Sequence, residues 1–451
     1  MQDLTQGPIP RHVFAMSVPI AAGMLLQTLY YFVDLYFVAR LGESALAGVS
    51  AAGNVLFLVF ALTQALGVGT VALVSHAVGR KDQAEANLVF NQSASLGVLM
   101  MAVTIAGGYA FSGTYMEMIG ADEATMRAGT SFLQWFVPGL ALQYPIVVMG
   151  SALRGTGIVK PTMIVQMLTV LLNAILAPSL IAGWGTGHPL GVAGAGLATT
   201  LATLAGVIVL AIYFARLEKY VQFHPAQFRP RAATWKRLLN VGLPAGGEFF
   251  AMAIFSGTIY WITGGFGAAA QAGFGIGSRI MQMVFLPAMA VAFAATPIAG
   301  QNFGAKLPER VRETFKTSAI ASCVIMALIT AFCQLEGEAM ARIFTDEPEV
   351  IGVTITFLGI ISWNFVAMGI VFTCSSLFQG LGNTWPSMVS MSLRVAAFFI
   401  PAVWLSRQPG FQLRHLWYLS VATATLQAGL SYALLRIEFR KRLPDTGRAA
   451  A

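Results

Sequence analysis

Twelve long apolar segments constrain the fold of this chain more than any other feature of its sequence. Each is close to the roughly 20 residues that an α-helix needs to cross a bilayer. Only 10% of the 451 residues are charged, whereas soluble domains carry about 25%. A transmembrane barrel would show short alternating segments, but these runs are uniformly apolar. The sequence predicts an all-α membrane protein with spans near 13–39, 50–77, 87–110, 130–152, 161–183, 191–215, 238–263, 275–300, 316–335, 350–378, 385–405 and 415–436.

The second half of the sequence repeats the first at an offset of 225 residues. Pro19 falls on Pro244, and the motif RGTGIVKPTM, which begins at Arg154, falls on QGLGNTWPSM, which begins at Gln379. Each half then has six helices, and an even number gives both halves the same orientation, so the repeat axis lies along the membrane normal. The predicted organisation is an N-terminal half (1–215), an inter-half linker (216–237) and a C-terminal half with a tail (238–451).

The net charge of +8 does not indicate nucleic acid, because the basic residues lie in loops between spans and no nucleic-acid motif interrupts them. If the N-terminus is cytoplasmic, most of the 27 lysines and arginines fall on the cytoplasmic side, as the positive-inside rule requires. Both termini and the linker are therefore expected in the cytoplasm, with the chain in a bacterial inner membrane.

Two acidic residues, Asp34 and Glu248, lie deep inside apolar spans. A carboxylate in hydrocarbon costs about 2.5–3.5 kcal/mol on insertion scales, so it is normally paired, protonated or facing water. At the repeat offset Asp34 corresponds to Ile259, and Glu248 corresponds to Gly23. Each acid therefore belongs to one half only, which indicates a role beyond the shared scaffold.

Asp34 shares one predicted helix face with Gln27, Tyr30 and Tyr31, at positions i, i+3, i+4 and i+7. This pattern favours a polar stripe that lines a cavity in the first half. The alternative is a neutral Asp34 that is hydrogen-bonded to a neighbouring helix for packing alone. A site that alternates between wet and dry surroundings would take up and release a proton, while a cationic substrate competes for the same carboxylate.

Glu248 has two open interpretations. It is either a second protonation site or the ion-pair partner of Arg394, the one arginine in the middle of a span, and the second, structural account is the plainer one. Pro19 lies about four turns before Asp34. It is either a hinge of the first helix or an ordinary membrane-helix proline.

Several motifs resemble the multidrug and toxic compound extrusion (MATE) transporters. They are LQTLYYFVDLYFVARLG in the first span, LRGTGIVKPT and FQGLGNTWPS after the fourth and tenth spans, and GVAGAGLATTLA in the sixth. The resemblance covers nearly the whole chain and is more DinF-like than NorM-like. It implies a cation-driven antiporter that exports amphipathic, often cationic compounds from the cytoplasm.

The resemblance also implies a site in the first half. The family's helix-1 aspartate matches Asp34, and Gln27, Asn173 and Thr199 match its polar neighbours. The family often has an aspartate four residues after the asparagine, where this chain has Ala177. Loss of that carboxylate favours H⁺ over Na⁺ as the coupling ion.

The alternatives are weaker. A lipid-linked precursor flippase of the same superfamily is the closest one, although twelve spans with one mid-span arginine argue against it. An enzyme would need a nucleophile–base pair or a metal cluster, and the five histidines are scattered. The chain has no P-loop, so transport must draw on an ion gradient. No cofactor or metal is expected, only drug-like substrates, the bilayer and a coupling ion, and the chain is expected to work as a monomer.

Overall fold

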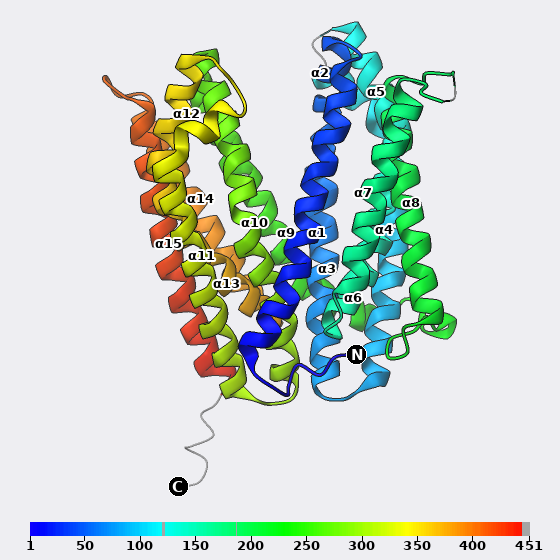
Figure 1. Cartoon of the computed structure of the whole chain (residues 1–451). Coiled ribbons are helices and arrows are strands. Elements are labelled where there is room, and N and C mark those ends of the chain that lie inside the picture. Colours follow the sequence, from blue (N-terminus) through cyan, green and yellow to red (C-terminus); the bar gives the residue numbers. More distant parts are fainter. Residues whose placement is uncertain (120–121, 186, 444–451) are drawn as a thin grey trace. The chain divides into compact units, whose positions relative to one another are not determined.

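The computed structural model describes residues 1–119, 122–185 and 187–443, and of residues 29–35 it describes only the backbone. Throughout this part the regular structure is helical, as the apolar segments predict (Figure 1). The elements are α1 (Ile9–Ala39), α2 (Glu43–Gly53), α3 (Val55–Gly79), α4 (Gln83–Ile119), α5 (Glu123–Ala141), α6 (Gln143–Gly155), α7 (Lys160–Ile181), α8 (Val192–Arg216), η1 (Pro225–Gln227), α9 (Ala232–Gly264), α10 (Ala268–Gly304), α11 (Pro308–Arg342), α12 (Pro348–Ile361), η2 (Ser362–Asn364), α13 (Phe365–Gly380), α14 (Trp385–Leu405) and α15 (Leu413–Arg442).

Eleven segments in the described residues are long and apolar enough to cross a membrane. Three of them consist of two helices in succession: α2 with α3, α5 with α6, and α12 with α13 through the short helix η2. The twelfth predicted span corresponds to α15, a helix of 30 residues. Its serines, threonines and glutamine, together with the basic residues of its last turn, make it less apolar than the others.

The chain divides into two compact units that exchange helix ends. The N-unit contains Met1–Asp3 and Ala22–Gly246, and the C-unit contains Leu4–Ala21 and the chain from Gly247 on. The division falls inside α1 after Ala21 and inside α9 after Gly246. These two points are 225 residues apart, and each lies two residues beyond a helix proline, Pro19 or Pro244. The internal repeat therefore extends to the points at which the helices change units.

The tight turns repeat at the same offset. In each half, a residue just after one helix has a positive φ, and its N–H donates a hydrogen bond to a carbonyl of the last turn. This is the usual role of glycine at a helix C-terminus. Gly157 (φ 82°) donates its N–H to Arg154 at 2.9 Å, and Gly382 (φ 74°) donates to Gln379 at 2.9 Å. The other matched pairs at positive φ are Gly42 with Gly267, Lys81 with Lys306, and Gly185 with Gly410.

The Gly382 turn provides a test of this backbone requirement. Replacing Gly382 by alanine should lower the free energy of unfolding by about 1–2 kcal/mol, because an L side chain is strained at positive φ. Gly429→Ala in α15 is the matched control, since a Cβ there meets nothing within 4 Å. Thermal unfolding in detergent measures both variants. A Gly382→Ala protein as stable as the control would contradict the assignment.

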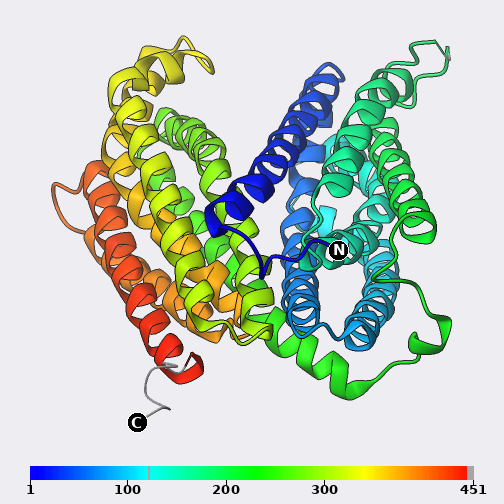
Figure 2. The same ribbon diagram turned by 60° about the horizontal axis from the view of Figure 1, so that its bottom comes forward.

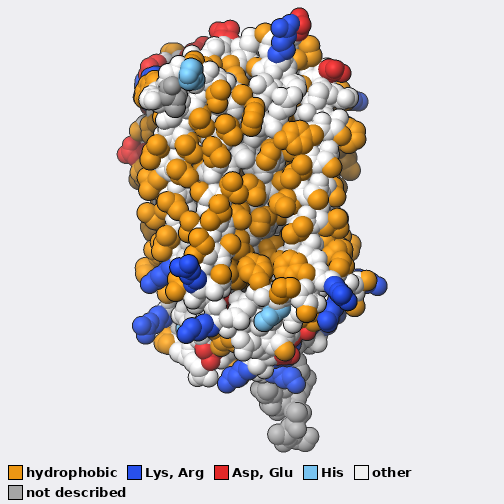
Figure 3. All heavy atoms as spheres, turned by 90° about the vertical axis from the view of Figure 1, so that its right-hand side faces the viewer, with side chains coloured by type: hydrophobic (Ala, Val, Ile, Leu, Met, Phe, Trp, Pro, Cys, Tyr) orange, Lys and Arg blue, Asp and Glu red, His pale blue; other side chains and the backbone are white. Residues whose placement is uncertain are grey.

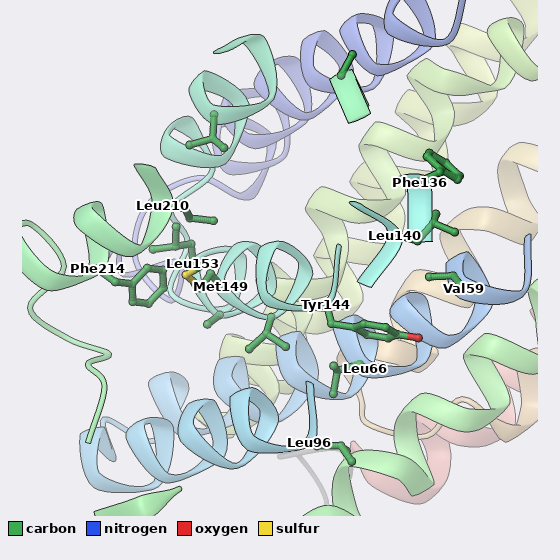
Figure 4. Packing of buried hydrophobic residues seen from close by; sticks show 14 of the residues in the cluster. Val59, Leu66, Leu96, Phe136, Leu140, Tyr144, Met149, Leu153, Leu210 and Phe214 are labelled. Atoms are coloured by element: carbon green, nitrogen blue, oxygen red, sulfur yellow. The ribbon is translucent and has the colours of Figure 1, made fainter. Parts of the chain in front are cut away.

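The core of the N-unit is built around Tyr144 of α6, which is completely buried. Its hydroxyl accepts a hydrogen bond from Thr104 of α4 at 3.1 Å. Figure 4 shows the surrounding apolar side chains, among them Leu66 of α3 and Leu140 of α5. This packing fixes α3, α4, α5 and α6 against one another.

The core of the C-unit contains an aromatic cluster. Trp417 of α15 stacks on Phe274 of α10 with ring centroids 5.6 Å apart, and meets Phe357 of α12 edge-on at 4.8 Å. Aromatic pairs at such separations add to the stabilisation that comes from burial alone. The cluster ties α15 into the unit and supports its assignment as a span.

The outer surface suits a lipid environment. Leu171 and Ile175 on α7 are 60% and 64% exposed, and they belong to a large set of exposed apolar side chains on the spans. Figure 3 shows one face whose middle is covered by hydrophobic side chains, while most lysines and arginines on that face gather at the end where Figure 1 marks the N-terminus.

The segment between α8 and α9 is held on α4 by a row of side-chain amides (Figure 2, the green connection). Asn87 donates to the Tyr220 carbonyl at 3.0 Å and accepts from the Gln222 N–H at 2.8 Å. Asn91 donates to the Gln222 carbonyl at 2.9 Å and accepts from the His224 N–H at 2.9 Å. The amides thus pair with an extended segment as a neighbouring strand would.

Asn91→Ala should release this connection. The substitution leaves the Gln222 carbonyl and the His224 N–H without their partners, which costs about 1–3 kcal/mol when such groups stay buried. Hydrogen exchange at residues 220–224 should accelerate, whereas Thr356→Ala, an exposed control in α12, should leave it unchanged. Unaltered protection at residues 220–224 would show that the amide row does not hold the segment.

Candidate functional site

Two residues of the predicted N-terminal pocket are buried on adjacent helices. Asn173 on α7 is completely buried, and Thr199 on α8 is 6% exposed. The Thr199 hydroxyl donates to the Ala195 carbonyl of its own helix at 3.1 Å. Ala177, one turn beyond Asn173, is also completely buried. The interior face of α7 therefore presents an amide followed by a methyl group, with no carboxylate.

The remaining predicted residues of this pocket lie on α1. Gln27 is exposed within the N-unit. The side chains of Tyr31 and Asp34 lie outside the described residues, and only their helical backbone is given. Their roles as pocket and coupling residues stay predictions.

One contact sets the register of α1 against α7 within the N-unit. A Cβ at Gly23 would stand 2.1 Å from Oε1 of Gln166, so the glycine allows the amide to lie against the helix backbone. The two helices are separated by an even number of span reversals and run parallel. Asp34 on α1 and Ala177 on α7 each lie eleven residues beyond this contact, about 16 Å along the respective helix axis.

Glu248 of α9 meets two serine hydroxyls in the C-unit. Its Oε2 accepts from Ser375 of α13 at 3.0 Å and from Ser387 of α14 at 2.8 Å, and the two serine oxygens are 2.9 Å apart. Gln379, one turn after Ser375, adds a longer contact of 3.4 Å from its amide to the Ser375 oxygen. Both serines and Gln379 are buried, and Glu248 is half-buried.

The three oxygen atoms form a closed triangle with room for one further proton. Three oxygen–oxygen contacts exist, but two hydroxyls supply only two hydrogens. An ionised Glu248 accepts both. A protonated Glu248 contributes the third hydrogen, so each contact then has its own donor. Both protonation states of the carboxyl therefore fit the same positions of the three oxygen atoms, and only one serine hydroxyl hydrogen has to turn.

Glu248 and Arg394 do not form the ion pair that the sequence left open. Nη1 of Arg394 donates to Oε1 of Gln427 on α15 at 3.0 Å and lies 3.2 Å from the Met368 sulfur on α13. The guanidinium carbon stands 4.6 Å from the ring centre of Phe255. Phe255 is seven residues after Glu248 on α9, about 10 Å along the helix axis, so the acidic and basic groups occupy separate layers.

Sequence reasoning missed the serines around Glu248. Ser375 and Gln379 stand at i and i+4 immediately before the turn that contains Gly382, and Ser387 lies just after it.

Among the described residues, no group of three or more His, Cys, Asp or Glu side chains is placed to hold a metal ion.

Comparison with known proteins decides the family. The sequence model of the MatE family matches twice, over residues 19–179 and 244–405. The matches begin at the paired prolines, 225 residues apart, so they reproduce the internal repeat. The chain belongs to the MatE family of multidrug efflux transporters. The predicted family is confirmed, and the protein is a transporter rather than an enzyme.

Individual MATE relatives are similar along nearly their whole length. The chain is 24% identical to the multidrug export protein MepA of Staphylococcus aureus over 438 residues, which cover 96% of this chain and 95% of that protein. It is 23% identical over 401 residues to an FAD transporter of Shewanella oneidensis, covering 88% of each. A solved outward-facing multidrug resistance MATE transporter superposes with a TM-score of 0.90 over 97% of both chains at 24% identity. The likeness confirms the predicted twelve-helix fold in two halves.

Proposed function

We propose that this MATE protein is an antiporter that exports amphipathic, cationic drugs or toxic metabolites in exchange for H⁺ by alternating access. The observation that carries the choice of ion is the methyl group of Ala177, which is buried on α7 one turn beyond Asn173, where no side-chain oxygen is present to complete a sodium site. Glu248 is the coupling residue of the C-terminal half, and Asp34 is that of the N-terminal half.

The α1–α7 register supports H⁺ rather than Na⁺ in the N-terminal half. The α7 residue as far beyond the contact of Gly23 with Gln166 as Asp34 is Ala177, whose side chain offers no oxygen ligand. A sodium ion prefers several oxygen ligands with at least one negative charge, whereas a proton needs one carboxylate. Asn173 and Thr199 supply neutral neighbours for that carboxylate, Gln27 and Tyr31 extend the pocket along α1, and Pro19 acts as a hinge where α1 passes between units.

The membrane orientation follows from the basic residues. They gather toward the end that carries the N-terminus on the face in Figure 3, and short loops rich in Lys and Arg stay cytoplasmic. Both termini then lie in the cytoplasm of a bacterial cell, and the monomer exports across the inner membrane.

Ethidium efflux tests the proposal. Right-side-out vesicles that contain the protein should expel ethidium when an inward ΔpH is imposed in Na⁺-free buffer, and an inward Na⁺ gradient without ΔpH should have no effect. Efflux that follows the Na⁺ gradient alone would overturn H⁺ coupling. A protein that moves no cationic dye under either gradient would favour the lipid-linked precursor flippase instead.

A further inference from the structure

Arg394 is a buried positive charge in the C-unit that no described acid neutralises. It is 7% exposed, and the two acids on the helices that contact it are engaged elsewhere: Glu248 by Ser375 and Ser387, and Glu438 by Arg442. Its own partners are the amide of Gln427, the sulfur of Met368 and the ring of Phe255. None of these carries a charge. If this position served packing alone, an apolar residue of the same size would stabilise the fold at least as well as a buried arginine.

The guanidinium keeps one edge without partners. Both neutral contacts use Nη1, while Nε has no hydrogen-bond partner and Nη2 makes none within the described part of the chain. The N–H groups of Nε and Nη2 point the same way and form the fork that binds two oxygens of one carboxylate or phosphate. The edge suited to an oxyanion is therefore the edge left vacant.

Phe255 gives the guanidinium group an aromatic neighbour. The ring lies over the guanidinium at 4.6 Å and is itself half-buried. Arg394 and Ser387 are seven residues apart on α14, as Phe255 and Glu248 are on α9, so the same two helix faces carry both layers. Because Nε is buried, a ligand reaches the fork only when a neighbouring side chain moves aside. A planar substrate bound there has the aromatic ring of Phe255 as a neighbour.

We propose that Arg394, with Phe255 and Gln427, is an oxyanion subsite in the C-terminal half that binds the carboxylate or phosphate of an aromatic substrate. This inference rests on the proposed export function and extends its substrate class to compounds that also carry an anionic group, zwitterions included. Lipid headgroups carry the same kind of oxyanion. The experiment therefore tests the carboxylate of a dye and the phosphate of a lipid separately.

Rhodamine 110 and rhodamine 123 form a matched pair of probes, because the second is the methyl ester of the first and lacks its free carboxylate. Fluorescence polarisation with purified protein in phosphatidylcholine nanodiscs should show that Arg394→Gln weakens rhodamine 110 binding at least tenfold and changes rhodamine 123 binding less than twofold. Arg394→Lys, which keeps the charge and loses the fork, should fall between. Arg279→Gln, an exposed arginine of α10, is the control.

Equal losses for both dyes would assign Arg394 a structural role and overturn the subsite. If Arg394→Gln does not fold, wild-type protein still decides: benzoate should displace rhodamine 110 and spare rhodamine 123, and failure to do so would overturn the proposal. Phosphatidylglycerol nanodiscs that suppress rhodamine 110 binding only when Arg394 is present would assign the oxyanion to a lipid headgroup. If vesicles export neither dye, the export function fails, and the binding titrations still test the subsite.

Discussion

Asp34→Asn should abolish ΔpH-driven drug export while leaving the protein folded. Asparagine has nearly the shape of aspartic acid but cannot exchange a proton or attract a cation, so the variant stays in one charge state through the cycle. A neutral amide in a membrane helix is also easier to accommodate than a carboxylate. Ethidium efflux should fall to the level of empty vesicles, with unchanged expression and melting temperature.

The control for this experiment is Asp346→Asn, which alters an exposed acid between α11 and α12. It should export ethidium at the wild-type rate.

The pH dependence of drug binding adds a second check. If one proton and one drug molecule exclude each other, drug affinity rises about tenfold per pH unit over the pH range in which Asp34 is protonated. Near-normal transport by Asp34→Asn, or a pH-independent affinity in the wild type, would remove Asp34 from the mechanism.

Glu248→Gln should leave drug binding intact and reduce ΔpH-driven export about tenfold, a loss of about 1.4 kcal/mol of coupling free energy. The glutamine amide donates as a protonated carboxyl does, so the contacts with Ser375 and Ser387 persist and the C-unit stays folded. What disappears is the exchange of a proton at this position. The measurement is ethidium transport in proteoliposomes at imposed ΔpH.

Ser387→Ala separates coupling from packing at the same site. It removes one hydroxyl of the triangle and keeps the carboxyl, so export should fall less than in Glu248→Gln and should shift along the pH axis. A Glu248→Gln protein that exports at the wild-type rate would make Glu248 a structural residue and leave Asp34 as the single coupling group.

Much of this fold could be predicted, because membrane spans and tight turns are local in sequence. The turns at Gly157 and Gly382 need a residue that tolerates positive φ, and the glycines mark both. The interruptions inside spans are less visible. The break at Ser362–Asn364 contains no proline, and the glycine that precedes it, Gly359, is a common residue of membrane helices.

The surroundings of the buried charges could not be predicted, because they depend on which helix faces meet. Ser375 and Ser387 are ordinary small residues of membrane helices, and their contact with Glu248 joins positions 127 and 139 residues apart. The amide row on α4 did leave a signal, with Gln83, Asn87 and Asn91 spaced by four at the start of an apolar span. Its partner, the connection after α8, carries no complementary pattern because its backbone makes the contacts.

Proton release on drug binding is the most direct measurement of the central claim. Ethidium added to purified protein in weakly buffered, Na⁺-free detergent solution should acidify the medium by about one proton per dye bound, and Asp34→Asn should release none. Ethidium binding that leaves the pH unchanged, or that requires Na⁺, would contradict the account of drug and proton as competitors for the same carboxylate.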